Sequence, residues 1–222
     1  MGLKYCKLTP SQQGQLLKLF IAGATARTAA ALTGVHRNSA ALFFTKLREL
    51  IADHQERQMQ EAFGGAVEID ESYFGGKRKG IRGRGAAGKV PVFGLLKRGG
   101  KVYAQMVGDC RKDTLLPIVR QRVEPQSLVY SDLFASYDTL SVEGYRHERI
   151  DHQKELAGKN GRHINGIENF WNQAKRHLRR FNGVPKASFH LFLKECEWRF
   201  NLKNPTEQLK SLRKLLKRSA IS

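Results

Sequence analysis

The sequence predicts an α/β protein in which a small all-helical module precedes a larger domain built on a mixed five-stranded sheet with flanking helices. Two observations lead to this fold class. Up to about residue 60, apolar residues recur at helical spacing, whereas from Val67 onward they alternate or form short runs typical of strands. Gly64-Gly65 separates the two patterns and marks a linker. At 222 residues the chain can hold either one sizeable core or a small module plus a core of about 150 residues.

Residues 1–62 are expected to form a helix-turn-helix module and a linker. Thr9-Pro10 is a start signal, because threonine caps a helix and proline suits its first position. A short alanine-rich helix begins at Thr25 and ends at Thr33-Gly34, and a third helix follows Asn38-Ser39. Small residues let two such helices cross closely, as in DNA-binding modules. Residues 36–39 would then face the major groove; the alternative is a three-helix bundle without DNA contact.

Residues 63–202 are expected to form the sheet domain. Its strands are predicted at 67–74, 90–96, 101–107, 127–131 and 147–150, and its helices at 114–123, 134–140, from 165 onward, and 189–201. A glycine-rich basic stretch at 77–89 reads as a flexible loop between the first two strands. Residues 203–222 form a basic tail or helix, and whether it binds DNA, binds a partner subunit or is only solvated stays open.

The charge balance indicates a polyanionic partner. There are 39 Lys and Arg against 20 Asp and Glu, which gives a formal charge of +19 and a pI near 10.2. Neutralising phosphates releases counterions, so nucleic acid is the expected partner. No apolar run approaches the ~20 residues of a membrane span and no signal-peptide core is present, so we expect a cytoplasmic protein with no membrane partner. The three cysteines are far apart and form no CxxC pair, which argues against a zinc site or a disulfide framework.

Three acids stand at positions that suggest a metal site. Asp70 lies within the first strand, Asp132 just past the fourth, and Glu168 in the first turn of the long helix. With the first and fourth strands adjacent, the two aspartates would meet at one sheet edge, and the helix could add Glu168. Clustered carboxylates repel unless a divalent cation neutralises them, and oxygen ligands favour Mg²⁺ or Mn²⁺. Two such ions can activate a water or a 3′-hydroxyl and stabilise the leaving oxygen of a phosphodiester.

The helix start also has a purely structural interpretation. Asn165 as the N-cap with Glu168 three residues later is a capping box, and it is compatible with a metal-facing carboxylate. Glu71 is a further candidate ligand, but strand alternation is expected to point it away from Asp70.

Several ordered motifs resemble bacterial insertion-sequence transposases of the ISXO-like type, which have a ribonuclease H-like catalytic core. The resemblance covers about residues 67–201. It is carried by residues 69–76, by Gly83-Arg84-Gly85 with Val92-Phe93-Gly94, by Tyr130-Ser131-Asp132, and by residues 163–171.

The resemblance implies a DDE transposase. Asp70, Asp132 and Glu168 would be its acidic triad, with two Mg²⁺ or Mn²⁺ ions, and Lys175 would contact DNA near the scissile phosphate. Some relatives use asparagine as the third ligand, so Asn165 competes with Glu168. Glu168 is preferred because a carboxylate is the stronger ligand for a hard cation.

The expected function is therefore binding of terminal inverted repeats followed by metal-dependent cleavage and strand transfer of double-stranded DNA. Because two ends are joined in concert, a homodimer or higher oligomer is expected. The alternatives are an inactive DNA-binding relic or regulator, and a structure-selective nuclease of the same fold. The residues expected to contact DNA are Arg37, Asn38, Ser39, Lys77, Arg78, Lys79, Arg82, Arg84, Lys175, Arg176 and Arg179.

Overall fold

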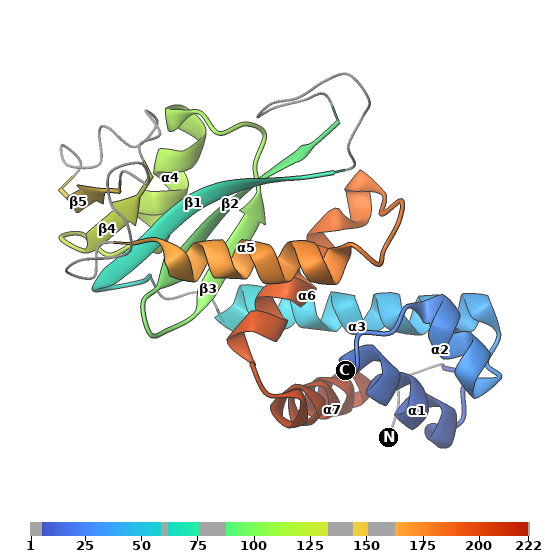
Figure 1. Ribbon diagram of the computed structural model, residues 1–222. Coiled ribbons are helices and arrows are strands. Elements are labelled where there is room, and N and C mark those ends of the chain that lie inside the picture. Colours follow the sequence, from blue (N-terminus) through green and yellow to red (C-terminus); the bar gives the residue numbers. More distant parts are fainter. Residues whose placement is uncertain (1–5, 59–61, 76–87, 133–143, 151–162, 222) are drawn as a thin grey trace. The chain divides into compact units, whose positions relative to one another are not determined.

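The computed structural model describes residues 6–58, 62–75, 88–132, 144–150 and 163–221 (Figure 1). The chain divides into two compact units. The helical unit consists of Met1–Gln58 together with Arg176–Ser222, and the sheet unit of Met59–Lys175. The domain boundaries expected after residues 62 and 202 remain predictions. The expected helix at 134–140 and most of the basic stretch at 77–89 lie outside the described residues.

The sheet unit confirms the mixed five-stranded sheet of a ribonuclease H-like fold. In the described residues the strand order is β3-β2-β1-β4-β5, with β1, β2 and β3 antiparallel and with β4 and β5 parallel to β1. The first and fourth strands are therefore neighbours, as expected. The strands are β1 (Ala66–Phe74), β2 (Val90–Lys97), β3 (Val102–Met106), β4 (Leu128–Ser131) and β5 (Arg146–Arg149).

Helices α4 (Lys112–Arg122) and α5 (Asn165–Leu178) cover opposite faces of this sheet (Figure 1). The α4 face is apolar: Val67, Ile69 and Tyr73 of β1 pack there with Leu115 and Val119 of the helix. The α5 face carries the residues between them, Glu68, Asp70, Ser72 and Phe74, because side chains alternate along a strand. The polar face of β1 is thus the face on which α5 lies.

The helical unit contains the three helices expected at the N-terminus. They are α1 (Pro10–Ile21), α2 (Ala26–Thr33) and α3 (Arg37–Gln58). Thr9 caps α1 in a capping box with Gln12, Thr25 caps α2, and Gly34 ends α2 with a left-handed backbone. The starts and stops were visible in the sequence because each is encoded within a few residues.

Two C-terminal helices complete this unit. Helix α6 (Phe189–Asn201) buries Trp198, and α7 (Pro205–Ile221) buries Leu212, Leu215 and Leu216, all in one core with the apolar faces of α1 and α3. The C-terminal segment is therefore a packed helix and not a solvated tail. Its leucines at positions three and four apart form the buried stripe.

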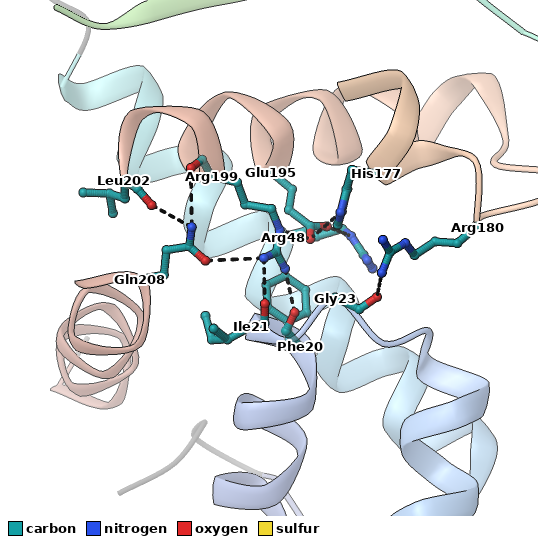
Figure 2. A network of polar contacts seen from close by, with 10 residues as sticks. All are labelled: Phe20, Ile21, Gly23, Arg48, His177, Arg180, Glu195, Arg199, Leu202 and Gln208. Carbon is teal, nitrogen blue, oxygen red and sulfur yellow. Dashed lines mark hydrogen bonds and ion pairs between the residues drawn. The ribbon is translucent and has the colours of Figure 1, made fainter. Parts of the chain in front are cut away.

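A buried charge network lies in the helical unit (Figure 2). Glu195 of α6 accepts hydrogen bonds from Arg48 Nε at 2.7 Å and Arg199 Nε at 2.8 Å, and its Oε1 lies 3.0 Å from His177 Nε2. Burial opposes the charge of Glu195, but the hydrogen bond of His177 and the charges of Arg199 and Arg48 hold its pKa well below the usual range. Arg199 also donates to the carbonyl oxygens of Phe20 and Ile21, which ties α6 to the end of α1.

Candidate metal centre

Asp70 and Asp132 meet because of the register between two parallel strands. Glu68 of β1 is paired with Tyr130 of β4, and each aspartate lies two residues further along its own strand direction. Both side chains therefore leave the backbone at the same level and toward the same face. β4 ends at Ser131, so Asp132 stands at the carboxyl end of its strand, next to the part of β1 that β4 no longer covers.

The structure adds a third acid to this pair. Among the described residues, Asp70, Glu71 and Asp132 form a group in which one carboxylate oxygen of each lies within 4.8 Å of the other two. Glu71 is 8% exposed and starts from the α4 face, opposite to Asp70. The expectation that Glu71 points away is therefore wrong for its carboxylate. Where β4 has ended, a glutamate side chain is long enough to reach around the strand edge.

The cluster changes the acidity of Asp70. Burial, together with the nearby charges of Glu71 and Asp132, raises the pKa of Asp70 to about 7. Hydrogen bonds from the Glu71 backbone and the Trp171 side chain act in the opposite direction. A divalent cation would remove the repulsion that holds a proton here, so the donor set fits a hard, oxygen-loving metal ion.

Trp171 holds the Asp70 carboxylate from α5. Its indole Nε1 donates to Asp70 Oδ2 at 3.0 Å, and the side chain is 4% exposed. Gly94 of β2, the partner of Asp70 in the sheet, makes room for the ring: a Cβ there would lie 2.6 Å from Trp171 Cζ2. Two motif residues that are distant in sequence thus form one contact. The sequence pattern singled out both but could not show that they touch.

Glu68 anchors the start of α5. Its Oε2 accepts the Ile167 backbone N–H at 2.9 Å, and its Oε1 accepts from Arg98 Nε at 3.0 Å. Arg98 also donates to the His163 carbonyl and stacks 3.6 Å from the centroid of the Tyr130 ring. Glu68 is 1% exposed, and its negative charge sits at the helix N-terminus, where the helix dipole favours it.

This anchoring replaces the expected capping box. The helix begins at Asn165 itself, and the Glu168 N–H donates to the Ile164 carbonyl at 3.2 Å, so Asn165 is the first helical residue and not the cap. A free N–H of the first turn is bonded by Glu68 from the sheet instead. A contact between residues 68 and 167 leaves no local trace in the sequence.

Glu168 and Asn165 lie on the first turn of α5, outside the three-acid group. Asn165 is exposed and Glu168 half-buried. Glu168 precedes Trp171 by three residues, so both side chains leave the same side of the helix, the side that contacts Asp70.

The basic residues expected to contact DNA are placed as follows. At the start of α3, Arg37 and Asn38 are exposed and Ser39 is half-buried. Lys175 is exposed, with its Nζ 5.9 Å from the centroid of the Phe74 ring. Arg176 and Arg179 are exposed. The loop residues lie outside the described part of the chain; they are Lys77, Arg78, Lys79, Arg82 and Arg84.

Two further features bear on the sequence expectations. Cys6, Cys110 and Cys196 are free thiols, of which Cys110 and Cys196 are buried. Within the described residues, every helix is too short or too polar to span a lipid bilayer.

Comparison with known proteins gives two kinds of match. An uncharacterized transposase-like protein of Haemophilus influenzae is 51% identical over 121 residues, which span 54% of this chain and 98% of that protein. Among solved structures, a simian T-cell lymphotropic virus intasome in complex with PP2A regulatory subunit B56 gamma aligns with TM-score 0.41 and 14% identity, covering 85% of this chain and 69% of that one. The Mos1 strand transfer complex aligns with TM-score 0.39 and 12% identity, covering 98% and 81%.

The family is decided by the sequence matches. The model of the ISXO2-like transposase domain matches residues 62–201, which is more than half of the chain and includes every acid of the candidate metal centre. The chain belongs to the family of ISXO2-like transposase domains.

Proposed function

We propose that this protein is an insertion-sequence transposase that binds the terminal inverted repeats of its element, cleaves the DNA strands there and joins them to a target. The observation that carries the proposal is the meeting of Asp70 and Asp132 at the ends of adjacent parallel strands, in a chain with a net charge of +19. Acidic groups that approach a phosphodiester need positive charge around them, and this chain has it in excess.

Asp70 and Asp132 are the residues that we propose hold Mg²⁺ or Mn²⁺, with two ions in the complete site. When bound, such ions would neutralise the charge of the phosphate and lower the pKa of the attacking hydroxyl group. The chain's own contribution is to fix the donors: the sheet register aligns the two aspartates, and the Trp171 indole orients one of them. No covalent link between protein and DNA is required.

For the third ligand we propose Glu168, with Asn165 as the alternative. Glu168 is supported by its position one helical turn before Trp171, on a helix whose start is anchored to β1 by Glu68. Glu71, a further candidate from the sequence, is a rival because its carboxylate lies in the three-acid group. Because Glu71 begins on the opposite face of the strand, we assign it the lesser role of raising the local negative charge.

For DNA recognition we propose the start of α3, with Arg37, Asn38 and Ser39 reading the terminal repeats. Lys175, Arg176 and Arg179 would contact the backbone, as would the loop residues Lys77, Arg78, Lys79, Arg82 and Arg84. Support comes from the exposure of Arg37 and Asn38 at a helix start and from the alanine-lined helix that packs behind it.

The deciding experiment is a nicking assay on duplex DNA that carries the element ends. With Mg²⁺ we expect nicking next to the repeats, and Asp132→Asn should reduce its rate at least ~100-fold, because a carboxylate metal ligand is lost. Asp113→Asn is the matched control, since it makes the same chemical change at an exposed position on α4. Undiminished nicking by Asp132→Asn would overturn the proposal.

The third ligand is tested by comparing Glu168→Gln, Asn165→Ala and Glu71→Gln in the same assay and in Mn²⁺ titration. We expect Glu168→Gln to lose nicking and to weaken Mn²⁺ binding more than either of the other two. A loss confined to Glu71→Gln or Asn165→Ala would transfer the role to that residue. Tight binding of end DNA with no binding of Mn²⁺ by the unaltered protein would instead identify an inactive regulator.

A further inference from the structure

A basic pocket opens in the helical unit at the start of α2. It has a volume of about 490 Å³. It is formed by the turn between α1 and α2 and by the end of α5 with the residues that follow it. The lining residues are Gly23, Ala24, Thr25, Thr28, Arg176, Arg179 and Arg180. We propose that this pocket binds a backbone phosphate of duplex DNA. The proposal rests on the DNA-binding function proposed above and adds a defined contact to it.

The charge of the pocket is positive and uncompensated. Three of its lining residues are arginines and none is an acid. Arg176 and Arg179 are exposed, and within the described part of the chain neither forms an ion pair. Three guanidinium groups gathered without a counter-charge repel one another, and an anion between them would relieve that repulsion.

Arg180 is fixed in place by the backbone. Its Nη1 donates to the carbonyl oxygen of Gly23 (Figure 2). Gly23 has a φ of +75°, and a Cβ there would lie 2.8 Å from Arg180 Nη1, so glycine suits this position on both counts. One N–H of the guanidinium is used in this bond, and four remain to donate to a ligand.

The start of α2 adds backbone N–H donors and the positive end of the helix dipole. Thr25 is the N-cap, its side chain accepts the Thr28 N–H at 3.1 Å, and the first turn contains no acid. The remaining N–H groups of this turn and the helix dipole favour an anion at this end. Arginine side chains and a helix start together can donate several hydrogen bonds to the two non-bridging oxygens that carry the negative charge of a DNA phosphate.

The position of the pocket fits a phosphate of DNA better than a free anion. Helix α2 has eight residues and is therefore about 12 Å long, and it separates the pocket from Arg37 at the start of α3. The major groove of B-DNA is also about 12 Å wide. With the start of α3 in the groove, the start of α2 would lie at its phosphate rim.

The test is a salt titration of DNA binding by fluorescence anisotropy, with one duplex that carries the element ends and one of scrambled sequence. For Arg176→Ala with Arg179→Ala we expect weaker binding of both duplexes by the same factor. The slope of log K against log salt should become shallower by about 0.9, the value for one lost phosphate contact. Arg213→Ala is the control, because it removes an exposed arginine of α7 outside the pocket, and it should leave the slope unchanged.

A second variant separates binding from folding. Thr28→Glu places a carboxylate in the pocket and also completes a capping box with Thr25, so the variant should melt at the same temperature as the unaltered protein or higher. We expect it to bind both duplexes at least ~10-fold more weakly, since a phosphate would meet a like charge. Unchanged affinity in this folded variant would overturn the proposal.

Two other outcomes are equally informative. If inorganic phosphate raises the melting temperature of the unaltered protein but not of Thr28→Glu, while both bind DNA alike, the pocket takes a free anion and the DNA assignment is wrong. If the unaltered protein fails to nick end DNA with Mg²⁺ but Thr28→Glu and the double arginine variant still weaken DNA binding, the proposed function fails and the pocket assignment stands.

Discussion

At the scale of single residues, Asp70 is the most informative group because its acidity ties the metal site to pH. Its pKa of about 7 means that roughly a tenth of the carboxyls are ionised at pH 6 and about nine tenths at pH 8. A metal ligand must be deprotonated, so a proton and a divalent cation compete for it. We expect Mn²⁺ to bind the protein about tenfold more tightly at pH 8 than at pH 6, measured by calorimetry.

The same carboxyl affects folding in a defined direction. Its pKa is higher in the folded protein than the ordinary 3.8, so its contribution to stability is fully present below about pH 4 and is lost as the pH rises through about 7. Without metal, the unaltered protein should therefore lose stability relative to Asp70→Asn between pH 4 and 8. If the difference in unfolding free energy between the two proteins stayed constant across this range, the pKa of Asp70 would not be raised in the folded protein.

Trp171 and Gly94 give a further prediction, because the indole ring packs where a side chain at position 94 would otherwise lie. Trp171→Phe keeps an aromatic ring but removes the N–H that bonds Asp70, so Mn²⁺ binding at pH 7 should weaken several-fold and the free energy of unfolding should fall by about 1 kcal/mol. Gly94→Ala should cost more stability, because its Cβ would lie 2.6 Å from the indole.

The double variant Gly94→Ala with Trp171→Phe sharpens this prediction. Phenylalanine lacks the indole atoms Cζ2 and Cη2 that the new methyl group would meet, so the second change should recover part of the lost stability. Urea unfolding of the four proteins measures the coupling. Strictly additive losses would show that the two residues are not in contact.

Sequence reasoning found Asp70 and Asp132 because both follow from strand placement: each is two residues beyond a paired position of adjacent parallel strands. It missed the approach of Glu71, since alternation describes the direction of Cβ and not the reach of a long side chain past a strand edge. It also missed the Trp171 bond to Asp70, because the residues are 101 apart and no local pattern records such a contact.

At the scale of elements, α6 is the helix on which the charge network depends. Glu195 is the common partner of Arg48, His177 and Arg199, and the Arg48 side chain is only 6% exposed. Glu195→Gln would leave that guanidinium buried without a counter-charge. We expect the free energy of unfolding to fall by about 3–5 kcal/mol, as for other broken buried ion pairs.

Glu49→Gln provides the control for this prediction. Its partner Lys46 lies three residues away on the same helix, and both side chains are about half exposed. Such a pair contributes well under ~1 kcal/mol, so its loss should leave the urea midpoint almost unchanged. If Glu195→Gln and Glu49→Gln lowered the free energy of unfolding equally, the buried Arg48 guanidinium would not depend on Glu195 for its counter-charge.

Helix boundaries were predictable where the signal is local and not where it comes from elsewhere in the fold. Thr9-Pro10, Thr25 and Gly34 marked α1 and α2 correctly, since capping threonines and a left-handed glycine act within one turn. The start of α5 was assigned the wrong cap, since a carboxylate from β1 bonds its first turn. The amphipathic pattern of α7 predicted a helix but could not name the core that buries it.

At the scale of the whole molecule, the proposed joining of two element ends in concert requires two copies of the active site. We expect the protein to form at least a homodimer when end DNA is present, and light scattering after size exclusion should show two or more chains per pair of ends. Scrambled duplex of the same length is the control. A single chain per duplex at saturating end DNA would favour a nicking enzyme that acts on one end at a time.

The helical unit is assembled from both ends of the chain, since Leu212, Leu215 and Leu216 share a core with Leu16 and Phe20. During synthesis α1 leaves the ribosome before α7, yet the core that the two helices share stays incomplete until α7 has been translated. Helices α1 and α3 therefore gain their full stability only after a segment that is far away in the sequence has been made. A stop codon ahead of α7 would destabilise α1 and α3, although both helices would be translated in full.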